Sequence, residues 1–215
     1  MPGNDLVLCV GDVHKSYGRR PVLCGASLEL SAGQVVGIVG ENGAGKSTLL
    51  RILVGDLKMD SGTVEHEGQL GYCPQKTVLH EAFTVDQHLR YFQVAYGLDR
   101  LDRALELLEA LNFTEYRHQR VHTLSGGTRQ KLNLTLALMH NPRLLLLDEP
   151  YQGFDWETYL RFWDLAKSLR ESGCSVLVVS HLAYDTDRLD AVYHLAEGTL
   201  RHTRQPVDDT CAGTT

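Results

Sequence analysis

The sequence of 215 residues predicts an α/β fold with a mainly parallel sheet, and three features lead to this prediction. A glycine-rich loop, Gly40 to Thr48, stands between an apolar run and a stretch with helical periodicity. The solid apolar run Leu144 to Leu147 is typical of a central strand that is covered on both faces. A further apolar run, Ser175 to Ser180, follows after one helical stretch. Strands that alternate with helices in this way form parallel sheets.

The glycine-rich loop, Gly40-Glu41-Asn42-Gly43-Ala44-Gly45-Lys46-Ser47-Thr48, has the pattern of a phosphate-binding loop. Its glycines allow backbone N–H groups to approach phosphate oxygens closely, and the next helix directs its positive N-terminus to the same point. We therefore expect Lys46 to contact the outer phosphates and the Ser47 hydroxyl to bind Mg²⁺. The strand Val35 to Val39 precedes the loop. The following helix has an apolar face made of Leu49, Leu50, Ile52 and Leu53.

The composition argues against several classes of protein. The formal charge of −6 argues against broad nucleic-acid binding, which usually needs a basic face. Five scattered cysteines without C-x-x-C spacing predict reduced thiols rather than a zinc or disulfide framework. No apolar run approaches the roughly 18 residues that span a bilayer, so we expect that the chain does not enter the membrane by itself.

Two antiparallel strands are predicted before the loop, at Leu6 to His14 and Val22 to Leu30, joined through Lys15 to Pro21. Tyr17 lies in this connection, where it could stack on a purine base or simply pack against a strand edge. After the loop helix, Thr63 to Glu65 and Gln69 to Cys73 predict two short strands around a turn at Gly68.

From Phe83 the apolar period becomes helical. The first predicted helix carries Val85, Leu89, Phe92 and Ala95 on one face and ends at Gly97. The second carries Leu101, Leu105, Leu108 and Leu111, with Asp99 as its N-cap. The third runs from Arg129 to Asn141, and Pro142 stops it.

The C-terminal part predicts a helix at Trp156 to Ser172 and a hairpin of Ala191 to Leu195 with Thr199 to His202. We interpret residues 1–202 as one domain, with a helical subdomain at about 76–140. The polar tail at 203–215 is predicted to be disordered.

An acidic pair ends the apolar run of residues 144–147. Either residue alone would be an ordinary strand edge, but the pair downstream of a phosphate loop favours a phosphohydrolase. Asp148 can hold the Mg²⁺ shell, while Glu149 can orient or deprotonate a water molecule.

With these motifs the sequence resembles the ATP-binding-cassette (ABC) ATPases from about Leu6 to His202. The matching segments are Gly40 to Thr48 (Walker A), Gln75 (Q-loop), Leu124 to Thr128 (signature motif), Leu144 to Glu149 (Walker B), Gly153 to Asp155 (D-loop) and His181 (switch histidine). The resemblance implies a RecA-like phosphate-loop NTPase core with an N-terminal antiparallel β subdomain and a helical signature subdomain.

The resemblance also implies ATP and Mg²⁺ as cofactors and gives each residue a role. Catalysis would involve Glu149, His181, Lys46 and Gln75, and the metal would be held by Ser47, Gln75 and Asp148. Nucleotide contacts are implied for Tyr17, Gly40, Asn42, Gly43, Ala44, Gly45, Lys46, Ser47, Thr48, Ser125, Gly126, Gly127 and Asp155.

Two motifs depart from the family pattern, the signature motif and the D-loop. Thr128 stands where glutamine is most common, and we expect little effect because the phosphate contacts fall to Ser125 and Gly127. Gly153 and Phe154 replace the usual small residue and leucine of the D-loop, which leaves the communication between sites open.

The resemblance favours an ATP-hydrolysing subunit that drives export through separate transmembrane permease subunits, paired with a second ABC ATPase subunit as a homodimer or heterodimer. Such a subunit would lie at the cytoplasmic face of the membrane and bind no nucleic acid. The segment from Thr84 to Leu98 is similar to the drug- and peptide-export branch. A soluble ATPase of the iron–sulfur-assembly type and a haem-export ATPase are the alternatives. A regulator without turnover is disfavoured because Glu149 and His181 are both retained.

The apolar residues after Gln75 predict a docking groove. Val78, Leu79 and Phe83, followed by Tyr91, could receive a short cytoplasmic helix of the membrane subunit. The alternative is that Phe83 only packs the helical part against the core.

Overall fold

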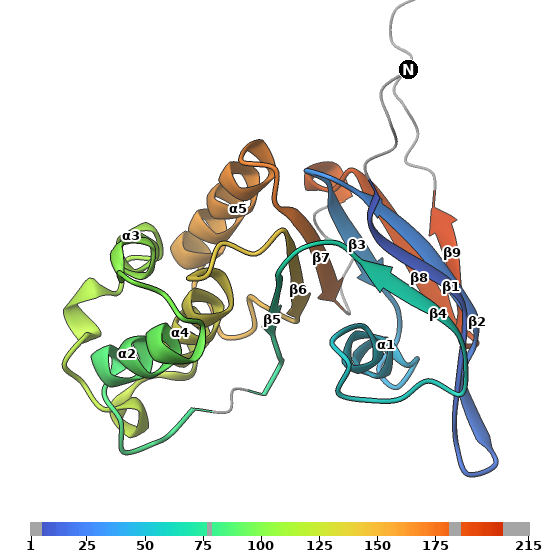
Figure 1. Cartoon of the computed structure of the whole chain (residues 1–215), viewed down its shortest axis with the longest axis horizontal. Coiled ribbons are helices and arrows are strands. Elements are labelled where there is room, and N and C mark those ends of the chain that lie inside the picture. Colours follow the sequence, from blue (N-terminus) through green and yellow to red (C-terminus); the bar gives the residue numbers. More distant parts are fainter. Residues whose placement is uncertain (1–5, 77–78, 181–185, 204–215) are drawn as a thin grey trace, which may run out of the picture.

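The computed structural model describes residues 6–76, 79–180 and 186–203, and Figure 1 shows them as two sheets with helices around them. Within these residues nine strands form the sheets: β1 (Leu6–Tyr17), β2 (Arg20–Ser31), β3 (Val35–Val39), β4 (Ser61–His66), β5 (Leu70–Cys73), β6 (Leu144–Asp148), β7 (Ser175–Ser180), β8 (Ala191–Ala196) and β9 (Thr199–Thr203). The main helices are α1 (Lys46–Leu53), α2 (Val85–Ala95), α3 (Asp102–Ala110), α4 (Gly126–Leu138) and α5 (Trp156–Glu171).

The larger sheet has the strand order β5-β6-β7-β3-β8-β9. Its pairs are parallel except for β8 and β9, which form the antiparallel hairpin expected around Glu197-Gly198. Every residue of β3, β6 and β7 is buried, because their continuous apolar runs are covered on both faces. The predicted α/β fold with a mainly parallel sheet is confirmed.

The smaller sheet has the order β2-β1-β4 and is antiparallel. The predicted connection over Lys15 to Pro21 is wrong in extent. The strands continue until Tyr17 pairs with Arg20, so Gly18 and Arg19 make the turn. Glycine suits this turn because Gly18 has a φ of 61°.

The two short strands around Gly68 exist, but they do not belong together. β4 adds to the antiparallel sheet through its pairing with β1, whereas β5 lies beside β6 in the parallel sheet. The turn at Gly68 therefore carries the chain from one sheet to the other.

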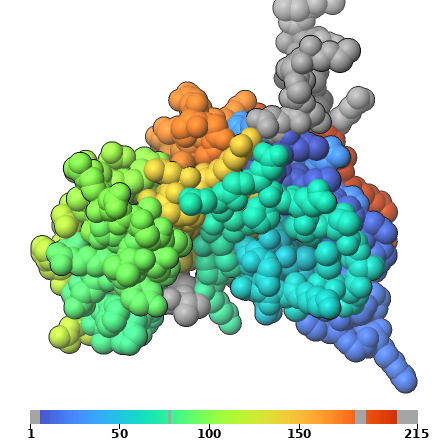
Figure 2. Space-filling model, viewed as in Figure 1, coloured from blue at the N-terminus to red at the C-terminus, as the bar shows by residue number. Residues whose placement is uncertain are grey.

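The helices α2, α3 and α4 form a separate lobe at one side of the parallel sheet (Figure 1), and Figure 2 shows this lobe at the opposite end of the molecule from the antiparallel sheet. Three details of the helix predictions are wrong. Ala95 is exposed, Asp99 is not a cap because α3 begins after Leu101, and α4 begins at Gly126. The carbonyl of Asp99 instead accepts a hydrogen bond from Gln93 Nε2 at 3.1 Å.

Two apolar clusters hold these parts together. The first joins both sheets through α1, whose Leu49, Leu50, Ile52 and Leu53 are buried as predicted. The second joins the helical lobe and α5 to the other face of the parallel sheet. The sheet is therefore the shared wall that fixes the loops at its carboxyl edge.

Within the described residues, no helix has the length and apolar character needed to cross a membrane. The predicted tail begins in β9, which ends at Thr203, and residues 204–215 lie outside the described residues.

Candidate functional site

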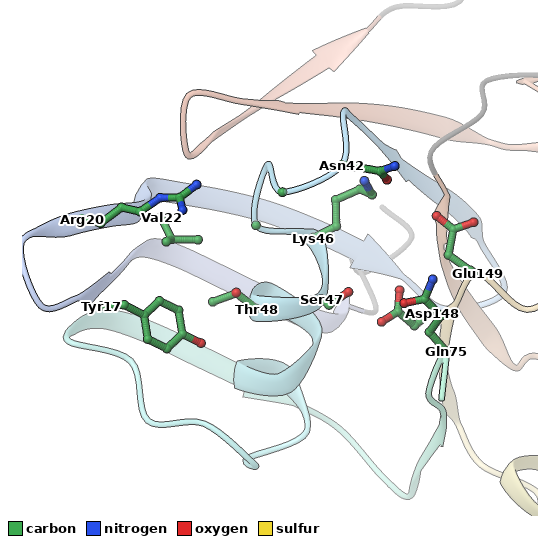
Figure 3. A pocket seen from close by; sticks show the side chains of 12 residues that line it. Tyr17, Arg20, Val22, Asn42, Lys46, Ser47, Thr48, Gln75, Asp148 and Glu149 are labelled. Carbon is green, nitrogen blue, oxygen red and sulfur yellow. The ribbon is translucent and has the colours of Figure 1, made fainter. Parts of the chain in front are cut away.

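A cavity of about 480 Å³ opens at the carboxyl edge of the parallel sheet (Figure 3). The loop after β3, the residues that follow β5 and the end of β6 reach it from the sheet, and the β1–β2 hairpin closes its far side. Its lining residues are Tyr17, Arg20, Val22, Asn42, Gly43, Gly45, Lys46, Ser47, Thr48, Gln75, Asp148 and Glu149. Most of the residues predicted to bind nucleotide or metal thus meet in one place.

The glycine-rich loop needs its glycines for two different reasons. Gly45 is the N-cap of α1 with a φ of 108°, a left-handed conformation that side-chain-bearing residues rarely adopt. Gly40 is needed for space, because a Cβ there would lie 2.5 Å from the carbonyl oxygen of Leu195. The loop and the N-terminus of α1 line the cavity, which is the arrangement that phosphate binding requires.

Lys46 is the buried cation in the phosphate loop, and it is 7% exposed. Its ammonium donates to the carbonyl oxygens of Gly40 at 2.7 Å and Glu41 at 2.9 Å. An ammonium has three N–H donors, so one donor and the full charge are left for an anion. Burial raises the pKa of the Asp148 carboxyl, and the charge of Lys46 opposes this shift.

A pair of oxygen ligands suited to Mg²⁺ lies beside the lysine. The Ser47 hydroxyl and the Asp148 carboxylate line the cavity together, and the nearby hydroxyl stabilises the ionised carboxylate. Figure 3 shows Gln75 at the same side of the cavity. Hydroxyl, carboxylate and amide oxygens are the donors that Mg²⁺ prefers, and it commonly takes only one or two protein ligands beside phosphate and water. The residues fit the metal that the sequence implies.

Glu149 has a backbone conformation that is unusual for its residue type. Its φ is 52°, in the left-handed region, and its side chain is largely buried. The backbone holds this conformation through two hydrogen bonds, from Glu149 N–H to the Val179 carbonyl at 3.0 Å and from Gln152 N–H to the Glu149 carbonyl at 3.2 Å. Strain of this kind concentrates at functional sites. Here it turns the side chain from the sheet edge into the cavity (Figure 3).

Tyr17 lies at the end of β1 on the far side of the cavity from Glu149 (Figure 3). Its side chain is 48% exposed, which leaves the ring available to an aromatic ligand. Arg20, its partner across the hairpin, also lines the cavity, and the sequence analysis missed it. Arg20 follows Tyr17 by three residues across the turn at Gly18, and this spacing could have identified it. The inference would have required knowing that both strands extend to the turn.

The signature residues lie away from this cavity. Ser125 is the N-cap of α4 on the helical lobe, and its hydroxyl accepts the N–H of Thr128 at 3.1 Å. Gly126 and Gly127 open that helix, and a Cβ on Gly127 would lie 2.6 Å from the carbonyl oxygen of Gly153. Asp155 caps α5 through a 2.7 Å bond from the Thr158 N–H. None of these residues lines the cavity, so within the described chain they do not complete the Lys46 site.

A buried polar contact joins the signature helix to the residues before Gln75. The side-chain amide of Asn133, in α4, donates to the Pro74 carbonyl at 3.0 Å and lies 3.2 Å from Cys73 Sγ. Burial raises the pKa of the Cys73 thiol, so the sulfur stays neutral. The sequence gives no local signal for this contact because its partners are 59 residues apart.

Two of the predicted residues are not placed. His181 and Val78 lie outside the described residues.

The sequence of this chain is similar to those of known proteins. Residues 23–152 match the family described as "ABC transporter". The chain is 32% identical over 193 residues to the linearmycin resistance ATP-binding protein LnrL of Bacillus subtilis, and the match covers 83% of this chain and 62% of LnrL. It is 38% identical over 188 residues to the zinc import ATP-binding protein ZnuC of Photobacterium profundum, covering 83% of this chain and 72% of ZnuC.

A solved structure shows the same fold. The dimeric structure of MJ0796, a bacterial ABC transporter cassette, superimposes with a TM-score of 0.84 at 26% identity, covering 92% of this chain and 98% of the cassette. The RecA-like core with its antiparallel and helical subdomains is therefore the fold of this chain.

Proposed function

The chain belongs to the ABC transporter family of ATP-binding proteins, and from that premise we propose that it is the ATP-hydrolysing subunit of a transporter whose membrane-spanning subunits are separate chains. The observation that carries the proposal is the cavity at the sheet edge. It combines a phosphate loop, a buried lysine, a serine–aspartate pair and a strained glutamate within one space.

The proposed nucleotide position follows from the two ends of the cavity. The adenine stacks on Tyr17, and the phosphates lie in the loop Gly40 to Thr48 against Lys46 (Figure 3). In this proposal the outer phosphate faces Asp148 and Glu149, which line the side of the cavity opposite Tyr17.

Hydrolysis then needs a base and charge compensation at the outer phosphate. We assign the base to Glu149, whose backbone aims the carboxylate into the cavity, and a supporting contact to Gln75. Mg²⁺, held by Ser47 and Asp148 with Gln75 nearby, would neutralise developing negative charge on the phosphates. We assign phosphate sensing to His181 by resemblance alone.

A second ABC ATPase subunit completes the proposed site. Ser125, Gly126, Gly127 and Asp155 lie outside the cavity of their own chain, so in this proposal they face the ATP of a second cassette. The similar cassette that is solved as a dimer supports this arrangement. We propose that both cassettes lie at the cytoplasmic face of the membrane, and that residues 1–202 are one cassette with its helical subdomain at about 76–140.

The second part of the proposal is the direction of transport, which we propose to be export. Its support is the similarity of the Thr84 to Leu98 segment to exporters and the name of LnrL, a resistance protein. ZnuC is named for import, so direction must be measured. Inverted vesicles that contain the chain and its membrane subunits should accumulate substrate upon ATP addition. Loss of preloaded substrate from these vesicles would identify an importer instead.

The binding assignment is tested by Lys46→Ala. Removal of the ammonium leaves phosphate charge uncompensated in a partly desolvated loop, so ATP affinity should fall by at least about 100-fold, on the scale of breaking a buried ion pair. The measurement is equilibrium binding of a fluorescent ATP analogue. Lys167→Ala, at an exposed position of α5, is the matched control and should bind normally. Normal binding by Lys46→Ala would refute the site.

A further inference from the structure

We propose that Thr128 is a positioning residue that directs the hydroxyl proton of Ser125 outward, toward an anionic oxygen on the second cassette. The proposal rests on the proposed function, since the acceptor is the outer phosphate of ATP bound to that cassette. From the sequence alone, we expect little effect of threonine in place of the usual glutamine. The contact between the Ser125 and Thr128 hydroxyls in the structure gives Thr128 a specific role.

The two hydroxyls are in direct contact at the start of α4. Ser125 Oγ and Thr128 Oγ1 lie 2.9 Å apart, and Ser125 Oγ also accepts the Thr128 N–H at 3.1 Å. Thr128 is 8% exposed, whereas Ser125 is exposed. No other hydrogen bond of the Thr128 hydroxyl occurs among the residues that the structure places. The buried hydroxyl therefore depends on Ser125 for its partner.

The arrangement differs from the usual capping box. There the third residue of the helix reaches back to the backbone N–H of the N-cap. Here Thr128, the third residue of α4, reaches the side chain of the N-cap instead.

The numbers of protons and lone pairs on the two hydroxyls determine where the Ser125 proton can point. A serine hydroxyl has one proton and two lone pairs. The Thr128 N–H occupies one lone pair of Ser125 Oγ. If Thr128 Oγ1–H donates to the second lone pair, the Ser125 proton has no intrahelical acceptor and points away from the pair.

The opposite direction is unproductive. If Ser125 donates to Thr128 Oγ1, the exposed oxygen presents no proton to an approaching phosphate, which can only accept. A phosphate on the second cassette selects the first arrangement, and Thr128 is then the donor that stabilises it. The pair acts as a relay of two hydrogen bonds that runs from a buried hydroxyl to the bound anion. No covalent bond changes and no proton leaves its oxygen.

The test uses the Glu149→Gln protein, in which we expect hydrolysis to be blocked and an ATP-bound dimer to accumulate. Three further substitutions are compared in this protein. Thr128→Val removes the hydroxyl at nearly constant shape, and Thr128→Ser restores it. The control is Thr135→Val, which removes another buried hydroxyl of α4, one that bonds the Lys131 carbonyl at 2.9 Å.

The dimer dissociation constant is measured by analytical ultracentrifugation with saturating MgATP, and ATP affinity of the monomer is measured separately. One neutral hydrogen bond is worth about fivefold, so Thr128→Val should weaken a dimer with two such sites by about 25-fold. Thr128→Ser should stay within about threefold of the parent, as should Thr135→Val. Monomer ATP affinity should be equal in all four proteins, because Thr128 lies outside the cavity.

Three outcomes would overturn the proposal. A Thr128→Val protein that dimerises as tightly as its parent shows that the hydroxyl has no positioning role. An equal loss in Thr135→Val shows a general effect of destabilising α4. A Glu149→Gln parent that remains monomeric refutes the two-cassette site, and this proposal with it. That failure is distinct from a failure of the Thr128 role, because it appears in a protein that retains Thr128.

Discussion

At the scale of single residues, the hydrogen-bond partners of a buried side chain can fix its protonation and orientation. His88 in α2 is an example outside the site. Its Nε2 accepts the His80 N–H at 3.0 Å, so its proton lies on Nδ1, which donates to the Thr84 carbonyl at 3.0 Å. Burial is the largest influence on His88 and lowers its pKa below the ordinary 6.5, while the bond to Thr84 opposes this shift.

This pKa predicts how stability depends on pH. The unfolded chain binds more protons than the folded chain between the lowered pKa and about 6.5, so the free energy of unfolding decreases as pH falls through that range. Above about pH 6.5 His88 is neutral in both states and has no effect on this slope. Melting temperatures between pH 8 and pH 5 should show the loss, and His88→Gln should reduce it.

The control for this prediction is His66→Gln, since His66 is exposed on β4. It should leave the pH profile unchanged. His140, whose pKa burial also lowers, contributes to the slope that remains in His88→Gln. An identical profile in His88→Gln and in the unsubstituted protein would contradict the assignment.

At the scale of elements, the chain after Gln75 is bonded to the chain before the signature motif. The His122 N–H donates to the Glu81 carbonyl at 3.1 Å, and the Val121 N–H donates to the Phe83 carbonyl at 2.9 Å. The Arg129 guanidinium adds a 2.9 Å bond to the Glu81 carboxylate and a weaker one to the Leu124 carbonyl at 3.3 Å. A displacement of residues 81–83 is therefore expected to move the N-terminus of α4 as well.

Phe83 is where we expect a membrane subunit to act on this pair of segments. Its half-buried ring stacks on His80 with a centroid distance of 4.3 Å, and Tyr91 nearby in sequence is 63% exposed. Phe83→Ala should leave ATP affinity and melting temperature nearly unchanged but weaken co-purification with the transmembrane subunit.

Phe113→Ala is the matched control, because Phe113 is fully buried in the core of the helical lobe. Loss of about 3–5 kcal/mol there should lower the melting temperature by roughly 10 °C. If Phe83→Ala behaves like Phe113→Ala and still binds the membrane subunit, Phe83 is a core residue and the docking groove lies elsewhere.

The elements also show how far the sequence alone can lead. β3, β6 and β7 were predictable because their apolar runs are continuous, and the phosphate loop because its pattern is local. β4 and β5 join different sheets, because β4 pairs with β1 and β5 pairs with β6. Both partners are far along the chain, so no local pattern predicts the pairing. Arg20 and Asn133 were missed for the same reason, since each gains its importance from a neighbour that no local pattern identifies.

At the scale of the whole molecule, the two halves of the proposed catalytic site lie in different parts of one chain. The cavity with Lys46 and Glu149 is at the sheet edge, whereas Ser125 begins α4 on the helical lobe and does not line the cavity. One rigid chain cannot bring them together, and two chains placed head to tail can. The central claim is therefore that ATP joins two cassettes.

The most direct test is the oligomeric state of Glu149→Gln with MgATP. The substitution removes the base but keeps the size of the side chain, so ATP should bind and persist between two cassettes. Sedimentation velocity should show a monomer without nucleotide and a dimer with saturating MgATP, and the dimer should require Lys46. A Glu149→Gln protein that binds ATP yet sediments as a monomer at saturating MgATP, with or without its membrane subunit, would contradict the account.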